Sequence, residues 1–105
     1  MMCEVFDLRK FEESVASGKP MMVDFGAEWC GPCKAMEPVI RELAKEYEGR
    51  IVVGSCDVEE NNALAVRFSI RNVPTVLFLK NGEVVDRCVG SVPKTTLVEK
   101  LEKLL

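Results

Sequence analysis

The sequence predicts an α/β domain in which helices cover both faces of a central mixed sheet, giving three layers. Apolar runs of strand length alternate with segments of helical periodicity, which is typical of parallel strands joined by right-handed crossovers. Near the end, two apolar runs flank Lys80-Asn81-Gly82, and Asn-Gly is a strong hairpin signal that adds antiparallel strands. No linker, repeat or low-complexity tract interrupts the 105 residues, so we expect one domain over 1–105 in the order βαβαβαββα.

The first half of the chain carries clear start and stop signals. Its predicted elements are a weak strand at 3–6, a helix at 8–17, a strand at 21–25 and a helix from residue 31 to about Gly49. Asp7 can cap the first helix, and Gly18-Lys19-Pro20 ends it. The strand "MMVDF" is nearly all apolar, as expected when both sheet faces are covered. Pro38 lies inside the second helix and removes one backbone donor, so we expect a kink there.

The second half completes the sheet. Its predicted elements are a strand at 51–58, a short helix at 61–68, strands at 74–79 and 83–89, and a last helix opened by Pro93. The apolar residues of the last helix recur at helical spacing, at Leu97, Val98, Leu101, Leu104 and Leu105.

Composition narrows the class of protein. The net charge is -3 and no Lys/Arg cluster occurs, which argues against nucleic acid or an anionic membrane as the main partner. Histidine is absent, which removes the commonest general base and metal ligand. The start lacks the basic region of a signal peptide, and no apolar run approaches the ~18 residues of a membrane span, so we expect a cytoplasmic protein. An odd number of cysteines, five, fits a reducing compartment in which a functional pair cycles.

Cys30 and Cys33 flank the dipeptide Gly31-Pro32 at the start of the second helix. On a regular helix, residues three apart have Cβ atoms about 5–6 Å apart, whereas a disulfide needs roughly 3.5–4.5 Å. Cys30 should therefore sit at the helix cap with the first turn tightened, which Gly31 permits and Pro32 suits. The spacing is what a small, switchable disulfide ring needs.

The same position predicts different roles for the two thiols. The unpaired N–H groups of a helix N-terminus stabilise an anion, so Cys30 is the expected exposed nucleophile, and Lys34 can help weakly. Cys33, one turn inside, is the expected buried resolving thiol. Asp24 stands in the buried strand that leads to this loop, where its pKa should rise. It could lie beneath Cys33 and accept that thiol's proton, or it could be a strand-end aspartate bonded to backbone.

Other uses of the cysteines are less consistent with the sequence. A structural zinc site requires four ligands, and this sequence has one closely spaced cysteine pair and no histidine. A permanent structural disulfide that closes so short a loop would stabilise the folded state little. Cys56 and Cys88 fall in predicted strands and should behave as small hydrophobes. Cys3 is near the terminus, where exposure could allow a regulatory disulfide or glutathionylation. Dithiol redox chemistry is therefore the favoured interpretation of the pair.

The stretches "DFGAEWCGPCK" at 24–34 and "NVPTVLFLKNGE" at 72–83, together with Gly90, resemble the thioredoxin family over essentially the whole chain. The resemblance implies a monomeric protein-disulfide reductase. Cys30 would attack a client's disulfide, and Cys33 would then displace the client and leave a Cys30–Cys33 disulfide. A thioredoxin reductase, either a flavoprotein drawing on NADPH or a ferredoxin-linked enzyme, would restore the dithiol. No cofactor would be bound to the chain itself.

The resemblance also implies a docking surface for disulfide-containing client proteins. Pro74 would be a cis proline facing the disulfide, although by itself it could be an ordinary proline at a strand start. The backbone near Val73 would then be free to pair with an extended peptide. The apolar rim would consist of Trp29, Gly31, Pro32, Val73 and Gly90. A lone tryptophan is more often a core residue, but the place of Trp29 beside the reactive loop leaves a core position and partial exposure equally open.

Two positions depart from the family pattern. Gly26 stands where an aromatic residue, most often tryptophan, is usual, which should loosen packing beneath the active loop and alter partner choice or redox poise. Ser55 stands where a lysine is often found near the buried aspartate. Two other functions remain open: an oxidant or isomerase on the same fold, which Gly31-Pro32 disfavours, and a non-catalytic binding module, which the intact cysteine pair disfavours.

Overall fold

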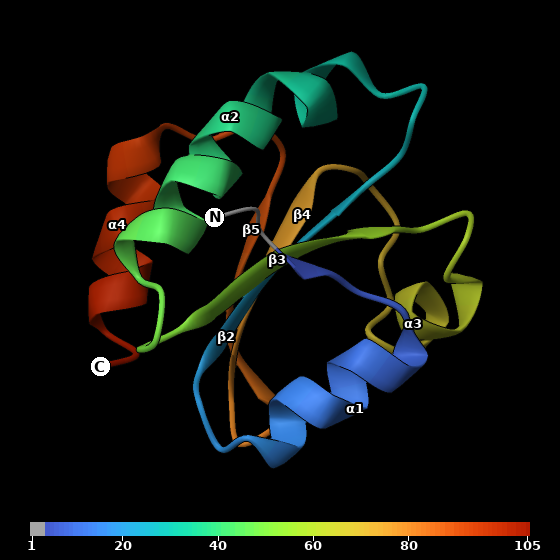
Figure 1. Cartoon of the computed structure of the whole chain (residues 1–105). Coiled ribbons are helices and arrows are strands. Elements are labelled where there is room, and N and C mark those ends of the chain that lie inside the picture. Colours follow the sequence, from blue (N-terminus) through green and yellow to red (C-terminus); the bar gives the residue numbers. More distant parts are fainter. Residues whose placement is uncertain (1–3) are drawn as a thin grey trace.

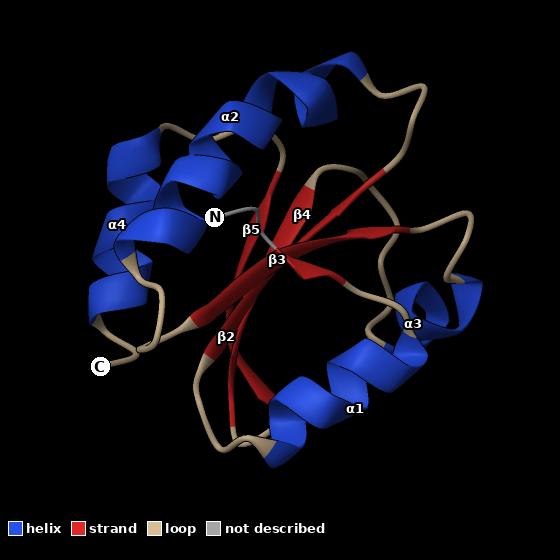
Figure 2. Ribbon diagram, viewed as in Figure 1, coloured by secondary structure: helices blue, strands red, loops and turns tan. Residues whose placement is uncertain are grey.

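The structure, a computed structural model, describes residues 4–105. Within these residues it contains one mixed sheet of five strands and four helices (Figures 1 and 2). The strands are β1 (Glu4–Val5), β2 (Met21–Gly26), β3 (Val52–Asp57), β4 (Thr75–Lys80) and β5 (Glu83–Val89). The helices are α1 (Leu8–Ala16), α2 (Gly31–Glu46), α3 (Asn62–Arg67) and α4 (Lys94–Glu102).

The strand order is β1-β3-β2-β4-β5. The β1–β3 and β2–β3 pairs are parallel, and the β2–β4 and β4–β5 pairs are antiparallel. Helices α2 and α4 cover one face of the sheet and α1 and α3 cover the other (Figure 1). The predicted α/β fold, with its element order and mixed sheet, is confirmed.

Local sequence signals account for several element boundaries. The Asp7 carboxylate accepts a hydrogen bond from the Lys10 N–H at 2.8 Å, so the predicted cap of α1 forms. Asn81 and Gly82 both adopt positive φ, 54° and 80°, as a tight hairpin between β4 and β5 requires. Helix α2 continues through Pro38. Pro93 is the cap residue of α4 rather than its first helical residue, and Leu105 is exposed beyond the end of that helix.

The edge of the sheet depends on one close contact. A Cβ atom at Gly54 would lie 2.5 Å from the Glu4 carbonyl oxygen and 2.6 Å from the Phe6 ring. Only glycine lets β1 and the segment after it lie this close to β3. The first residue of the strand predicted at 3–6, Cys3, lies outside the described residues.

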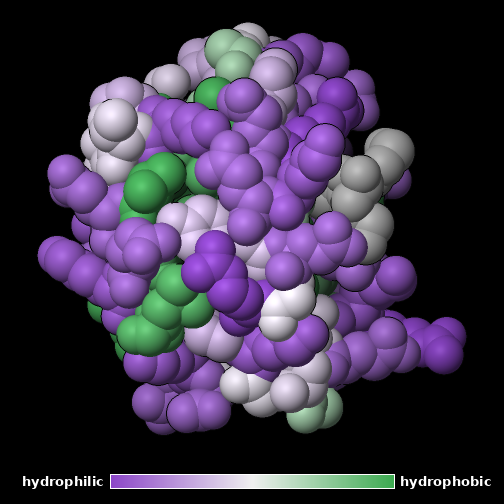
Figure 3. All heavy atoms as spheres, turned by 60° about the vertical axis from the view of Figure 1, so that its left-hand side comes forward, coloured by the Kyte–Doolittle hydropathy of each residue, from purple (hydrophilic) through white to green (hydrophobic). Residues whose placement is uncertain are grey.

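The core consists of two apolar layers, one on each side of the sheet. The layer under α2 and α4 includes Met22, Ile40 and Leu101, and the layer under α1 and α3 includes Val23 and Phe11. Figure 3 shows that the face with α2 and α4 is mostly polar outside, with scattered apolar groups. Alternation along β2 places Asp24 on the same face as Met22, beneath α2. The sheet therefore places one carboxyl group against the helix that contains Cys33 and is capped by Cys30.

Candidate functional site

Cys30 is the N-cap residue of α2, and it forms a disulfide with Cys33. The two Cα atoms are 5.3 Å apart. The Cys33 backbone N–H donates a hydrogen bond to the Cys30 sulfur, with 3.2 Å between nitrogen and sulfur. The predicted position of Cys30, at the cap and outside the regular helix, is confirmed. The sequence folds this way because Gly31 and Pro32 occupy the first turn, where a missing backbone donor costs nothing.

The predicted difference in exposure between the two cysteines is wrong for this disulfide form. Each has 5% of its surface exposed. They pack against one another and Ala27, with Val58 and Val73 beside them. Val58 and Val73 come from distant parts of the chain, so the burial of Cys30 depends on tertiary packing that its own helix does not reveal.

Several of the residues predicted to form a docking rim are exposed next to the disulfide in the chain. Trp29 is 67% exposed, so it is a surface residue and the core alternative is wrong. Gly31 and Pro32 are also exposed. Trp29 and Val73 line a surface hollow of about 350 Å³, together with Val58, Ile70, Arg71 and Asn72. The structure thus brings together, at one end of the sheet, residues that are more than forty positions apart in sequence.

The segment before β4 adjoins the same rim. The Val73–Pro74 peptide bond is cis, as the family resemblance implies. The Gly90 N–H donates to the Pro74 carbonyl oxygen at 2.8 Å, and Gly90 has a φ of 88° that favours glycine. Val73 packs against the cysteine cluster. Pro74 itself is buried, whereas Val73 is half-buried.

Asp24 is a buried carboxyl group with an unsatisfied oxygen. Only 4% of its surface is exposed, and Oδ1 has no hydrogen-bond partner among the described residues. Its neighbours in the sheet are Ser55 on β3 and Val76 on β4, neither of them charged. Burial, and to a lesser degree the nearby Glu37 carboxylate, raise the pKa of Asp24 from 3.8 to about 7. The rise predicted from the sequence is confirmed.

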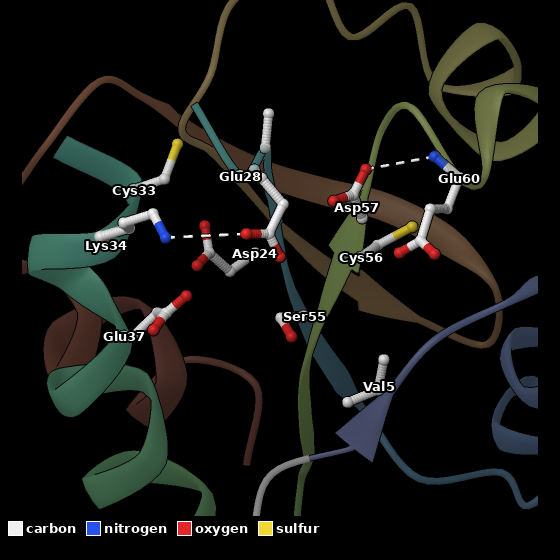
Figure 4. Close-up of a pocket in the computed structure, with 12 residues that line it drawn as sticks. Val5, Asp24, Glu28, Cys33, Lys34, Glu37, Ser55, Cys56, Asp57 and Glu60 are labelled. Carbon is white, nitrogen blue, oxygen red and sulfur yellow. Dashed lines mark hydrogen bonds and ion pairs between the residues drawn. The ribbon is translucent and has the colours of Figure 1, made fainter. Parts of the chain in front are cut away.

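A cavity of about 190 Å³ connects Asp24 with Cys33 (Figure 4). It is large enough for several water molecules, and its lining is polar enough to hold them. Gly26 leaves part of this space open, because a Cβ atom there would lie 3.2 Å from the Cys33 Cβ and 3.3 Å from its sulfur. Gly26, identified in the sequence as a departure from the family pattern, therefore borders Cys33 directly.

Sequence reasoning missed the acidic residues of this cavity. Glu28 and Lys34 form an ion pair across its rim, with 3.7 Å between Oε2 and Nζ (Figure 4). Glu37 also lines it. Glu37 follows Cys33 by four residues, so the two side chains lie on the same face of α2. This helical spacing was the one sign in the sequence that Glu37 could lie near Cys33.

The remaining described cysteines lie in the core. Cys56 and Cys88 are free and buried, as predicted for small hydrophobic side chains. Burial raises the pKa of the Cys56 thiol to about 12 and raises the pKa of Cys88 as well, so both are poor nucleophiles. The hypothesis of a regulatory role for Cys3 falls outside the described residues. Across residues 4–105, no group of three potential ligands is placed to hold a metal ion.

The site is thus a disulfide at the N-terminus of a helix, carried on a three-layer α/β fold with a mixed sheet. Comparison with known proteins identifies the family: the family model described as Thioredoxin matches residues 3–103. The chain belongs to the thioredoxin family. Members of this family carry no bound cofactor beyond the redox-active disulfide.

Individual relatives support the assignment. Thioredoxin M-type, chloroplastic, from Spinacia oleracea is 54% identical over 86 residues, which cover 82% of this chain and 48% of the relative. The chain thus spans about half the length of that relative. Thioredoxin 1 from Nostoc sp. is 45% identical over 102 residues, 97% of this chain and 95% of the relative. The solved structure of a mutant thioredoxin from Halobacterium salinarum NRC-1 superposes with a TM-score of 0.90 at 31% identity, covering 98% of this chain and 90% of that one.

Proposed function

We propose that this single-domain protein is a protein-disulfide reductase that acts by dithiol–disulfide exchange. The Cys30 thiolate attacks one sulfur of a client disulfide, forms a mixed disulfide and releases the other client sulfur as a thiolate. The Cys33 thiolate then attacks Cys30, which breaks the mixed disulfide and releases the second client thiolate. Two electrons pass to the client, and the Cys30–Cys33 disulfide remains. The observation that supports this most strongly is the capping position of Cys30, with the Cys33 N–H directed at its sulfur.

The cap geometry favours Cys30 as the attacking thiol. Its sulfur accepts a backbone hydrogen bond at the positive end of a 16-residue helix, and both effects stabilise a thiolate. Cys33 is one turn further in and lines the cavity that contains Asp24. A thiolate at Cys33 must form before the second step, and an ionised Asp24 accepts that proton through the cavity.

The exposed rim is the proposed docking surface for client proteins. Trp29, Gly31 and Pro32 present exposed surface next to the disulfide. Val73 lines the same surface hollow as Trp29, and next to it the Gly90 N–H donates to the Pro74 carbonyl oxygen. In this proposal the Val73 backbone pairs with an extended client segment. The clients are proteins with accessible disulfides, and a thioredoxin reductase restores the dithiol.

The proposed setting is a cytoplasm, with the chain acting as a monomeric electron carrier. The relatives from Nostoc and Synechocystis, each matched over 95% of its length, carry no organelle in their descriptions, whereas the M-type relatives are described as chloroplastic. Within residues 4–105, no helix combines the length and apolar content that crossing a bilayer requires.

Insulin reduction tests the proposal. With dithiothreitol as reductant, the wild-type protein should accelerate the appearance of turbidity, and Cys30→Ser and Cys33→Ser should both abolish the acceleration. Cys88→Ala is the matched control, since it removes a thiol that lies in the core away from the active loop. If Cys30→Ser accelerated insulin reduction as much as the wild type does, the mechanism would be refuted. If the wild type itself gave no acceleration, a non-catalytic binding module would be favoured. Measuring the potential of the pair against glutathione would separate a reductant from an oxidant.

A further inference from the structure

Glu37 lines the cavity between Asp24 and Cys33 and has no part in the exchange steps described above. We propose that Glu37 is a positioning residue that acts through Asp24: its negative charge, facing Asp24 across the cavity, makes the buried carboxylate a stronger base for the Cys33 thiol. This inference rests on the proposed proton-accepting role of Asp24. On this proposal, Glu37 helps to set the pH range in which Cys33 attacks the mixed disulfide.

The geometry places three groups around one space. Cys33 and Glu37 are four residues apart on α2, so their side chains leave the same face of the helix. Alternation along β2 directs Asp24 toward that face. All three line the cavity, and Figure 4 shows the Glu37 and Asp24 carboxyl groups pointing toward one another. The unsatisfied Oδ1 of Asp24 leaves this carboxyl group sensitive to the charges around it.

The other charges around the cavity do not cancel that of Glu37. The titratable groups that line it are Glu28, Lys34 and Glu37 from α2 and the preceding loop, and Cys56, Asp57 and Glu60 from β3 and the following turn. Lys34, the cation of this set, pairs with Glu28, and Asp57 accepts hydrogen bonds from the N–H groups of Glu59 and Glu60. On the neighbouring strands, Asp24 faces Ser55 and Val76, which carry no charge.

Glu37 itself is only weakly neutralised. Its partner Arg41 is 3.9 Å away, and both side chains are more than half exposed, so solvent screens this pair. The next contribution to the raised pKa of Asp24 after burial is the Glu37 charge. An aspartate with an ordinary pKa is a poor base for a thiol, because its pKa lies far below that of the thiol. Each unit by which the Asp24 pKa rises narrows this difference and makes the proton transfer less unfavourable.

Titration of the Asp24 carboxyl by carbon-detected NMR, on the reduced protein, tests the inference. Two unit charges ~10 Å apart in water shift each other's pKa by about 0.3 unit, so Glu37→Gln should lower the Asp24 midpoint by at least that amount. Glu37→Asp keeps the charge and should lower it less. Glu42→Gln, on the same helix but not lining the cavity, is the matched control and should leave it unchanged.

Arg41→Gln separates charge from a merely structural effect. It breaks the same ion pair but keeps the Glu37 charge, so the Asp24 midpoint should stay or rise. An unchanged midpoint in Glu37→Gln, or an equal fall in Arg41→Gln, would overturn the inference. Asp24 titrates whether or not the protein reduces disulfides, so this result is independent of the insulin assay.

A kinetic measurement ties the charge to the reaction. The pH at which the resolving rate falls to half should move downward in Glu37→Gln, together with the Asp24 midpoint. In an Asp24→Asn background, Glu37→Gln should leave the pH profile of that rate unmoved. A shift of the same size without Asp24 would show that Glu37 acts by another route, and the inference would be wrong.

Discussion

Asp24 is buried, and its Oδ1 has no hydrogen-bond partner within residues 4–105, so this group makes the stability of the protein depend on pH in an unusual direction. Folding raises the pKa of Asp24 from 3.8 to about 7, so between these values the folded state holds a proton that the unfolded state has lost. Stability must therefore fall as pH rises through this window. Asp24→Asn removes the titrating group with little change in shape and should remove this part of the pH dependence.

The size of the effect follows from the shift. A rise of about three units at 1.36 kcal/mol per unit corresponds to about 4 kcal/mol. The wild type should lose about 4 kcal/mol relative to Asp24→Asn between pH 4 and pH 8. Comparing the difference at two pH values cancels the constant cost of burying the asparagine amide.

Urea denaturation of the oxidised proteins, followed by far-ultraviolet circular dichroism at pH 4, 6 and 8, measures this difference. Glu42→Gln alters an exposed carboxylate of α2, and its free energy of unfolding should change with pH as that of the wild type does. If the wild-type and Asp24→Asn free energies of unfolding ran parallel from pH 4 to pH 8, burial would not raise the pKa of Asp24, and this prediction would be wrong.

Three further substitutions test other parts of the structure. Asp86→Asn should lower the free energy of unfolding by up to about 1 kcal/mol at pH 7, because the hydrogen bond from the Lys100 ammonium holds the pKa of Asp86 below its usual 3.8. That difference should shrink as pH falls below 3.8 and be lost below the lowered pKa of the folded state; an undiminished difference there would contradict it. Gly54→Ala should cost about 1–3 kcal/mol in urea denaturation, because its Cβ would lie 2.5 Å from the Glu4 carbonyl oxygen; a neutral result would mean that β1 packs less closely. Trp29→Ala should change stability by less than about 0.5 kcal/mol but raise KM for insulin, because the ring is exposed on the docking rim; an unchanged KM would exclude it from docking.

Features set by local sequence could be predicted, and features set by packing between distant segments could not. The Asp7 cap, the Asn81-Gly82 hairpin and the capping position of Cys30 depend on a few adjacent residues, and all three form. The burial of Cys30 depends on Val58 and Val73, which the fold brings from other elements, and there the prediction was wrong.

The site shows the same division. Asp24 was found because a carboxylate inside an apolar strand is conspicuous in the sequence. Glu37 was missed because it looks like an ordinary polar residue of α2, and only the placement of the helix over β2 makes it line the cavity. The exposed Trp29 and the Pro74–Gly90 contact required the family resemblance or the structure itself.

The proposed mechanism requires above all that the Cys30 thiol is ionised by its place at the start of α2. Alkylation of reduced Cys33→Ser protein with iodoacetamide across pH 4 to 10, with modification at Cys30 quantified by mass spectrometry, measures this directly. The rate should rise with a midpoint well below the ~8.5 of a free cysteine, since the backbone N–H of residue 33 remains directed at the sulfur. A midpoint at or above that of free cysteine would contradict the account.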